Sequence, residues 1–281
     1  MKITVLIENT KPDGESSLVC EHGLSLLIEE SGRRLLLDSG STESFFDNAK
    51  ALNVSLTDLN LCVLSHGHYD HSGGYGALFK ANPDIMVYAR KSALNHYYSG
   101  IGEMHEIGIP ENVLEYSDRF ILVDGIRQIS DNIYLVPHDV EGLSEIGKKA
   151  KLFKLSDGKI VPDDFSHEQS LVYDTPKGLV IFNSCSHAGA GSIISEARRA
   201  MGGKNVYAYV GGLHMKGRSH GIETCTFSDA EIDLLCREIK REEIKYVYTG
   251  HCTGLIGIEK MQERLGDMVR PLTTGLKFII E

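Results

Sequence analysis

The sequence predicts an α/β (α+β) protein that forms a single domain over residues 1–281. Short runs of Val, Ile and Leu bounded by turn residues dominate the N-terminal half, which indicates β-strands. In the C-terminal half such runs alternate with segments expected to form helices. No stretch rich in Pro, Gly or Ser separates the halves. We therefore expect one domain with an insertion near residues 91–165, the least patterned part of the chain.

The expected elements follow in chain order. Strands are predicted at residues 3–8, 24–28, 34–37, 61–64 and 85–89, with helices at 43–52 and from 75 to about 80. Within the insertion, strands are predicted near 119–123 and 132–136. A hairpin of 170–173 and 178–182 follows, then a helix at 190–201, a strand at 205–210 and a capping box at residues 228–231 that begins a helix reaching about residue 242. A strand at 245–248, a helix at 256–265 and a final strand at 277–280 complete the order.

One ten-residue segment, 65–74, is the most informative part of the chain. It reads Ser-His-Gly-His-Tyr-Asp-His-Ser-Gly-Gly and directly follows the apolar run 61–64. His66 and His68 point to the same side of an extended segment, while Asp70 and His71 lie in the turn that follows. Four metal-capable side chains at the end of a buried strand predict a site for one metal ion or two adjacent ions. Asp70 is also the candidate for proton transfer.

Further histidines follow other predicted strands. His187, His214 and His251 each come after an apolar run, whereas His167 precedes one. Histidine ligands usually need an acceptor for their second nitrogen. Asp38 ends the strand 34–37 and is predicted to orient one of these rings, and His214 is placed with it as a residue that supports the ligands.

The composition restricts the partners. A formal net charge of −10 argues against a nucleic-acid backbone as the partner, although an anionic small molecule fits a local basic pocket. No apolar run approaches the roughly 20 residues that span a bilayer, so no membrane partner is expected. The cysteines lack a C-x-x-C pair, which favours reduced thiols and a cytoplasmic location. An insertion of this size often forms an interface, so an oligomer remains open.

The motifs together resemble the metallo-β-lactamase superfamily. H-x-H-x-D-H at 66–71 is its signature, and the segment 35–40, Leu-Leu-Leu-Asp-Ser-Gly, is similar to its early aspartate motif. More closely, the chain resembles the branch of metal-dependent hydrolases that includes 7,8-dihydropterin-6-methyl-4-(β-D-ribofuranosyl)aminobenzene-5′-phosphate synthase. That match is carried by residues 21–25, 66–71, 167–171, 185–187, 211–214 and 249–254.

The resemblance implies a four-layer αβ/βα sandwich and a set of metal ligands. His66 and His68 would bind the first ion, and Asp70, His71 and His251 the second. Either His187 or His167 would complete the first site, with His187 favoured. Where many members carry a bridging aspartate, this chain has Cys185, or Ser184 beside it. Zn²⁺ is the expected ion because a thiolate would favour it, with iron or manganese as alternatives.

Three functions are compatible with these residues. The first is a hydrolase in which a metal-bound hydroxide attacks an ester, lactone or phosphoester of a small molecule. The second, implied by the resemblance, is a transferase that joins a dihydropterin methyl diphosphate to a β-ribofuranosyl aminobenzene phosphate and releases pyrophosphate. The third is a regulatory protein with structural metals, which the number of candidate ligands disfavours because a structural zinc site is closed by four.

Overall fold

The computed structural model describes residues 1–12, 14 and 16–281. They divide into two compact units, which are described separately. The first unit comprises residues 1–125, 139–169 and 273–281, and the second comprises residues 126–138 and 170–272.

The first unit is built on a seven-stranded sheet with the order β20-β1-β2-β3-β4-β5-β8. From β3 to β8 the strands run parallel, whereas β1, β2 and β20 pair antiparallel. The strands are β1 (Lys2–Ile7), β2 (Ser25–Glu30), β3 (Arg33–Leu37), β4 (Leu61–Val63), β5 (Val87–Arg90), β8 (Phe120–Val123) and β20 (Lys277–Ile279).

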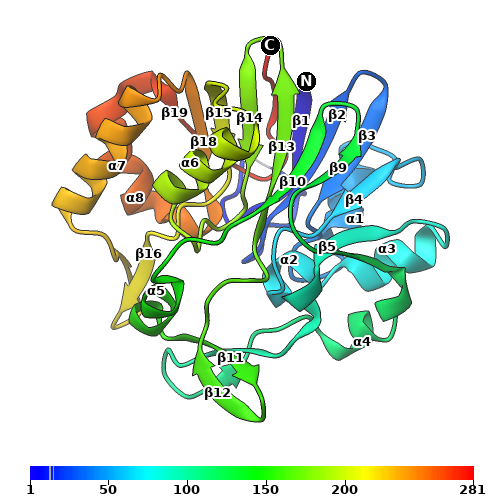
Figure 1. The fold of residues 1–281 in the computed structure, drawn as a ribbon. Coiled ribbons are helices and arrows are strands. Elements are labelled where there is room, and N and C mark those ends of the chain that lie inside the picture. The colour runs from blue at the N-terminus through cyan, green and yellow to red at the C-terminus, as the bar shows by residue number, and fades with distance from the viewer. Residues whose placement is uncertain (13, 15) are drawn as a thin grey trace. The chain divides into compact units, whose positions relative to one another are not determined.

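Helices cover this sheet, as Figure 1 shows for α1 (Ser44–Ala51) and α3 (Tyr75–Ala81). Phe45 of α1 and Tyr75 of α3 are fully buried in one cluster with Leu36 and Leu64. The remaining helices of the unit are α2 (Tyr69–Ser72), α4 (Glu111–Leu114) and α5 (Leu143–Ala150), with 3₁₀ turns at η1 (Lys91–Leu94) and η2 (Ser117–Arg119). This core fixes the strand ends from which the loops of the candidate site emerge.

A small sheet of order β12-β11-β6-β7 also belongs to the first unit. Its strands are β6 (Tyr97–Ser99), β7 (His105–Glu106), β11 (Leu152–Ser156) and β12 (Lys159–Pro162). All four lie within residues 91–165, the segment predicted to be an insertion. The same segment also supplies β8 to the large sheet and two strands to the sheet of the second unit, so only part of it stands outside the large sheets.

The second unit holds a seven-stranded sheet of order β19-β18-β15-β14-β13-β10-β9. From β14 to β19 the strands are parallel, and β13 with β14 forms the predicted hairpin. Its strands are β9 (Arg127–Ser130), β10 (Ile133–Pro137), β13 (Gln169–Thr175), β14 (Gly178–Phe182), β15 (Val206–Val210), β18 (Tyr246–Thr249) and β19 (Val269–Pro271).

The helices α6 (Ala190–Ala200), α7 (Asp229–Arg241) and α8 (Gly254–Leu265) lie beside these strands (Figure 1). The predicted capping box is present, since Ser228 and Glu231 each accept the other's backbone N–H at the start of α7. A separate hairpin of β16 (Lys216–Ser219) and β17 (Ile222–Cys225) and the 3₁₀ turns η3 (His251–Thr253) and η4 (Gly266–Met268) complete the unit.

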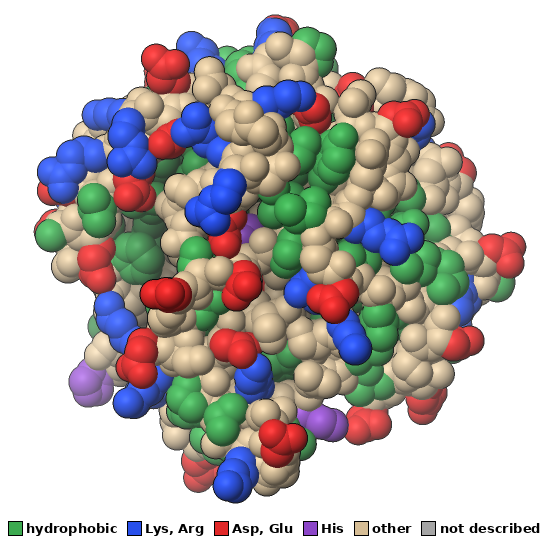
Figure 2. Space-filling model, in the orientation of Figure 1, with side chains coloured by type: hydrophobic (Ala, Val, Ile, Leu, Met, Phe, Trp, Pro, Cys, Tyr) green, Lys and Arg blue, Asp and Glu red, His purple; other side chains and the backbone are tan. Residues whose placement is uncertain are grey.

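On the face shown in Figure 2, Lys and Arg side chains alternate with Asp and Glu, and apolar groups lie between them. Among the helices of the described residues, none is long and apolar enough to cross a membrane.

Candidate active site

The loop after β4 carries the histidine motif of the first unit. His66 and His71 are fully buried, and His68 and Asp70 are 5% and 7% exposed. The centroid of the His66 ring lies 4.6 Å from the centroid of the His68 ring and 4.2 Å from that of the His71 ring. The four predicted ligands of this loop are therefore gathered in one buried cluster.

Asp38 holds two of these rings from the end of β3. Its Oδ2 accepts from Nδ1 of His71 at 2.8 Å and from the hydroxyl of Ser65 at 2.7 Å. Since the Ser65 hydroxyl gives its proton to Asp38, it accepts from Nδ1 of His66 at 2.8 Å. Both rings thus carry a proton on Nδ1, which leaves Nε2 as the atom that would bind a metal. Asp38 was predicted from the sequence to orient one ring.

The charge states of this cluster fit metal binding. Burial lowers the pKa of His68 to about 3, so this ring is neutral, as a ligand must be. Burial also acts to lower the pKa of His71, but Asp70 and Asp38 outweigh it and raise the pKa to about 10. The Oδ2 atom of Asp70 lies 3.5 Å from Nε2 of His71. A divalent cation bound to His71 would replace that ring's Nε2 proton. Imidazole and carboxylate together form a donor set that suits zinc, iron or manganese.

His22 also contacts this cluster, although the sequence analysis gave it no role. Its Nδ1 lies 3.3 Å from the Asn9 amide, and its Nε2 lies 3.2 Å from Oδ2 of Asp70. The ring is exposed, unlike the buried histidines of the motif. Its position in the segment 21–25, which carries the family resemblance, was the available signal.

His167 lies beside the cluster, with both ring nitrogens hydrogen bonded. Its Nδ1 accepts the Gly67 backbone N–H at 2.9 Å, so the proton is on Nε2, which donates to Oδ2 of Asp163 at 3.0 Å. The Tyr97 ring packs on it with centroids 4.0 Å apart. Burial acts to raise the pKa of Asp163, but its contacts with His167 and the Phe165 N–H outweigh burial and lower the pKa. Asp163 was not predicted, because nothing in the local sequence marks it.

In the second unit, three predicted residues follow parallel strands. Cys185 and His187 come after β14, and His251 comes after β18; they are 4%, 4% and 2% exposed. His214, which follows β15, is half-buried, and its ring centroid lies 4.4 Å from that of His187. The carboxyl ends of neighbouring parallel strands are where such folds place their chemistry.

A buried polar network supports the Cys185-Ser186-His187 loop. Asn183 accepts the Ser186 backbone N–H at 2.7 Å and donates to the hydroxyl of Ser170 at 3.0 Å. His138 links Ser170, at 2.8 Å, to Glu196 of α6, at 3.0 Å. This Ser–His–Glu arrangement resembles a hydrolytic triad, but Ser170 is fully buried. We assign it the role of fixing the loop.

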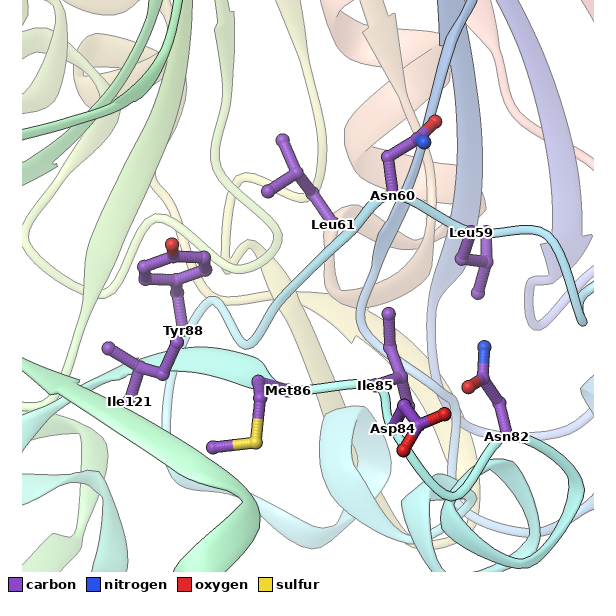
Figure 3. Close-up of a pocket in the computed structure, with 9 residues that line it drawn as sticks. All are labelled: Leu59, Asn60, Leu61, Asn82, Asp84, Ile85, Met86, Tyr88 and Ile121. Carbon is purple, nitrogen blue, oxygen red and sulfur yellow. The ribbon is translucent and has the colours of Figure 1, made fainter.

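A pocket of about 340 Å³ lies elsewhere in the first unit (Figure 3). Asn60 and Leu61 line it at the start of β4, and Met86 lines it just before β5. It therefore opens at the amino ends of these parallel strands, whereas the histidine loop follows the carboxyl end of β4. Asp84 is the carboxylate among its lining residues. The pocket does not contribute to the candidate site.

Comparison with known proteins agrees with this geometry. The family model of the metallo-β-lactamase superfamily matches residues 18–149. A curated relative, the 7,8-dihydropterin-6-methyl-4-(beta-D-ribofuranosyl)-aminobenzene-5'-phosphate synthase of Methanocaldococcus jannaschii, is 29% identical over 270 residues, which cover 91% of this chain and 88% of the relative.

Solved structures show the same fold. The crystal structure of Tm1679, described as a metal-dependent hydrolase of the beta-lactamase superfamily, is 27% identical, covers 100% of this chain and 99% of its own, and has a TM-score of 0.81. Zn²⁺-bound PqqB from Methylobacterium extorquens matches with a TM-score of 0.55 at 13% identity, covering 100% of both chains, which shows the fold alone. The predicted resemblance and fold class are confirmed.

Proposed function

Because this chain has the metallo-β-lactamase fold, we propose that it is a metal-dependent hydrolase of an ester, lactone or phosphoester. The observation that carries the proposal is the buried carboxylate of Asp38, which fixes His71 directly and His66 through Ser65. Two imidazoles oriented by a carboxylate add little to the packing of a protein core. A divalent ion, in contrast, requires histidine ligands that are held in this way.

We assign the ligands as follows. The first unit offers His66, His68, Asp70 and His71 as ligands, and the second unit offers His187, His251 and Cys185. His167 is left out because Nδ1 accepts from Gly67 and Nε2 donates to Asp163. Asp163 and Tyr97 hold its ring in place, so its role is to position the backbone between His66 and His68.

A bound divalent ion would supply an activated water near neutral pH and neutralise developing negative charge. The residues of the chain provide the remaining functions. Asp38 orients His66 and His71. Asp70 is placed to accept a proton on Oδ2, and Nε2 of His22 lies 3.2 Å from the same oxygen. The buried loop around His68 excludes bulk water from the ligand atoms.

The transferase is the second candidate, and one observation favours it. The relative named as a synthase aligns over 91% of this chain. In that reaction the same residues would bind a diphosphate leaving group rather than an activated water. Incubation with a dihydropterin methyl diphosphate and a β-ribofuranosyl aminobenzene phosphate separates the two. A coupled product with released pyrophosphate favours the transferase, and ester or phosphoester hydrolysis alone favours the hydrolase.

Metal analysis tests the proposal itself. We expect the purified protein to contain one to two divalent ions per chain, and His68→Ala to lose metal and turnover while its circular dichroism is preserved. His220→Ala, which removes an exposed histidine of the β16–β17 turn, is the matched control and should keep both. A metal-free protein with full turnover, or a fully active His68→Ala variant, would refute the proposal.

A further inference from the structure

Three parallel strands of the second unit end beside one another, and their loops bring two cysteines and a histidine together. Cys185 follows β14, and His251 and Cys252 follow β18; β15 lies between these strands. The ligand atoms of the three side chains all lie within 4.8 Å of one another. All three are buried, with Cys252 9% exposed. The sequence analysis included Cys185 and His251 but gave Cys252 no role.

The loop after β15 is shaped around the sulfur of Cys252. The backbone N–H of His214 donates to Sγ at 3.3 Å. A Cβ on Gly212 would lie 2.4 Å from the same sulfur, so only glycine leaves room for it there. The thiol of Cys252 also donates to the carbonyl oxygen of Cys185 at 3.5 Å, which ties the loops after β14 and β18 together.

We propose that Cys185, His251 and Cys252 form a soft-ligand set that binds a divalent ion through two thiolates and one imidazole. The proposal rests on the proposed metal-dependent function and deepens it, because it names the ligand chemistry that the second unit offers. Zinc, cadmium and cobalt accept such donors, whereas magnesium and calcium select oxygen ligands. Ligands on a tetrahedral zinc lie about 3.7 Å apart, given Zn–S bonds of about 2.3 Å. The upper limit of 4.8 Å on the separations of the three ligand atoms is close to that value.

The other buried cysteines lack this setting. Cys62 lies within β4, and Cys236 lies on α7; burial raises the pKa of both thiols. Neither occurs in any group of three metal-capable side chains found among the described residues. Cys236 therefore provides a matched control for a Cys→Ser substitution.

Cobalt substitution tests the proposal. The reduced full-length protein is stripped of metal, reloaded with Co²⁺, and its near-ultraviolet sulfur-to-cobalt charge-transfer absorption is measured per bound ion. We expect this absorption in the wild type, a loss of about half of it in Cys185→Ser and in Cys252→Ser, and no change in Cys236→Ser. A Cys252→Ser spectrum identical to that of the wild type would overturn the proposal.

X-ray absorption of the zinc-loaded wild type needs no substitution and guards against a variant that fails to fold. We expect two sulfur neighbours at about 2.3 Å on one ion. Ions bound in the expected number with no sulfur neighbour, or with only one, would refute this inference and leave the proposed function intact. Failure to bind any divalent ion would refute both.

Discussion

Replacement of His167 by alanine should destabilise the first unit strongly, because its ring satisfies two buried partners. The Gly67 N–H would lose its acceptor, at a cost of about 1–3 kcal/mol for an unsatisfied buried donor. Asp163 is fully buried, and its carboxylate accepts hydrogen bonds from His167 and from the Phe165 N–H; the variant would keep the second and lose the first. Losing the hydrogen bond that His167 donates to this charged group costs about 1.5–3 kcal/mol more. The free energy of unfolding should therefore fall by roughly 2.5–6 kcal/mol.

Urea denaturation followed by circular dichroism measures this loss at pH 7. His167→Asn places a carbonyl oxygen near the position of Nδ1, so it should retain the Gly67 contact and recover part of the loss. His220→Ala, at an exposed turn, should change the free energy of unfolding by less than about 0.5 kcal/mol. A loss below about 1 kcal/mol in His167→Ala would refute the reasoning.

The same variant separates the positioning role from the ligand role that the sequence left open. If His167 holds the loop, folded His167→Ala should still bind ions in the wild-type number, with weaker affinity, because His66 and His68 remain. If His167 is a ligand, one ion should be lost with little change in stability. Titration against a chelator under native conditions distinguishes these outcomes.

The remaining predictions concern the loop, the helix cap, pH and the metal. Gly67→Ala should lower metal content and stability, since its Cβ would lie 2.3 Å from the carbonyl oxygen of Ala93; unchanged metal analysis would contradict this. Ser228→Ala should lower the free energy of unfolding by about 1 kcal/mol without changing turnover, because it removes the capping box of α7, and urea denaturation checks it. The lowered pKa of Asp163 stabilises the fold above its unfolded pKa of about 4, and this stability should be lost as the pH falls through the lower folded value. The free energy of unfolding, measured at several values from pH 6 to pH 2, should therefore fall less with decreasing pH in Asp163→Asn than in the wild type. A chelator should abolish turnover and Zn²⁺ should restore it; turnover that persists in metal-free protein would exclude the metal's role.

Elements with strong local signals were predicted accurately from the sequence. The strand at residues 178–182 has the predicted bounds, and the capping box at residues 228–231 forms as expected. Both depend on short-range chemistry, namely a continuous apolar run and a reciprocal side-chain cap. The strand of residues 61–63 was predicted for the same reason, and the loop that follows it carries the histidine motif.

Elements without such signals were missed. Helix α5 occupies a polar segment and begins at Leu143; its N-cap residue, Gly142, has a φ of 85° and provides no side-chain cap. The hairpin of β16 and β17 has no apolar alternation; its turn depends on His220 and Gly221, both at positive φ. A two-residue turn that ends in glycine predicts a hairpin when alternating apolar strands flank it. The strands on either side of His220 and Gly221 are too polar for that prediction.

Within the candidate site, the sequence identified residue types but not the contacts that assign their roles. The sequence favoured His187 over His167 without deciding between them, because His187 follows an apolar strand and His167 precedes one. The distinction depends on Asp163, four residues before His167, and on the Gly67 N–H, which lies 100 residues earlier in the chain. These contacts are set by tertiary packing.

Asp38 illustrates how one early residue determines the chemistry of a later motif. Two imidazoles of the motif could in principle present either nitrogen as a ligand, and the motif itself does not decide which. One carboxylate at the end of β3 accepts from Nδ1 of His71 and, through Ser65, determines the proton position on His66. Because Asp38 is fully buried, water does not compete for these bonds. The strand pairing of β3 with β4 therefore sets the tautomers as well as the positions of these two histidines.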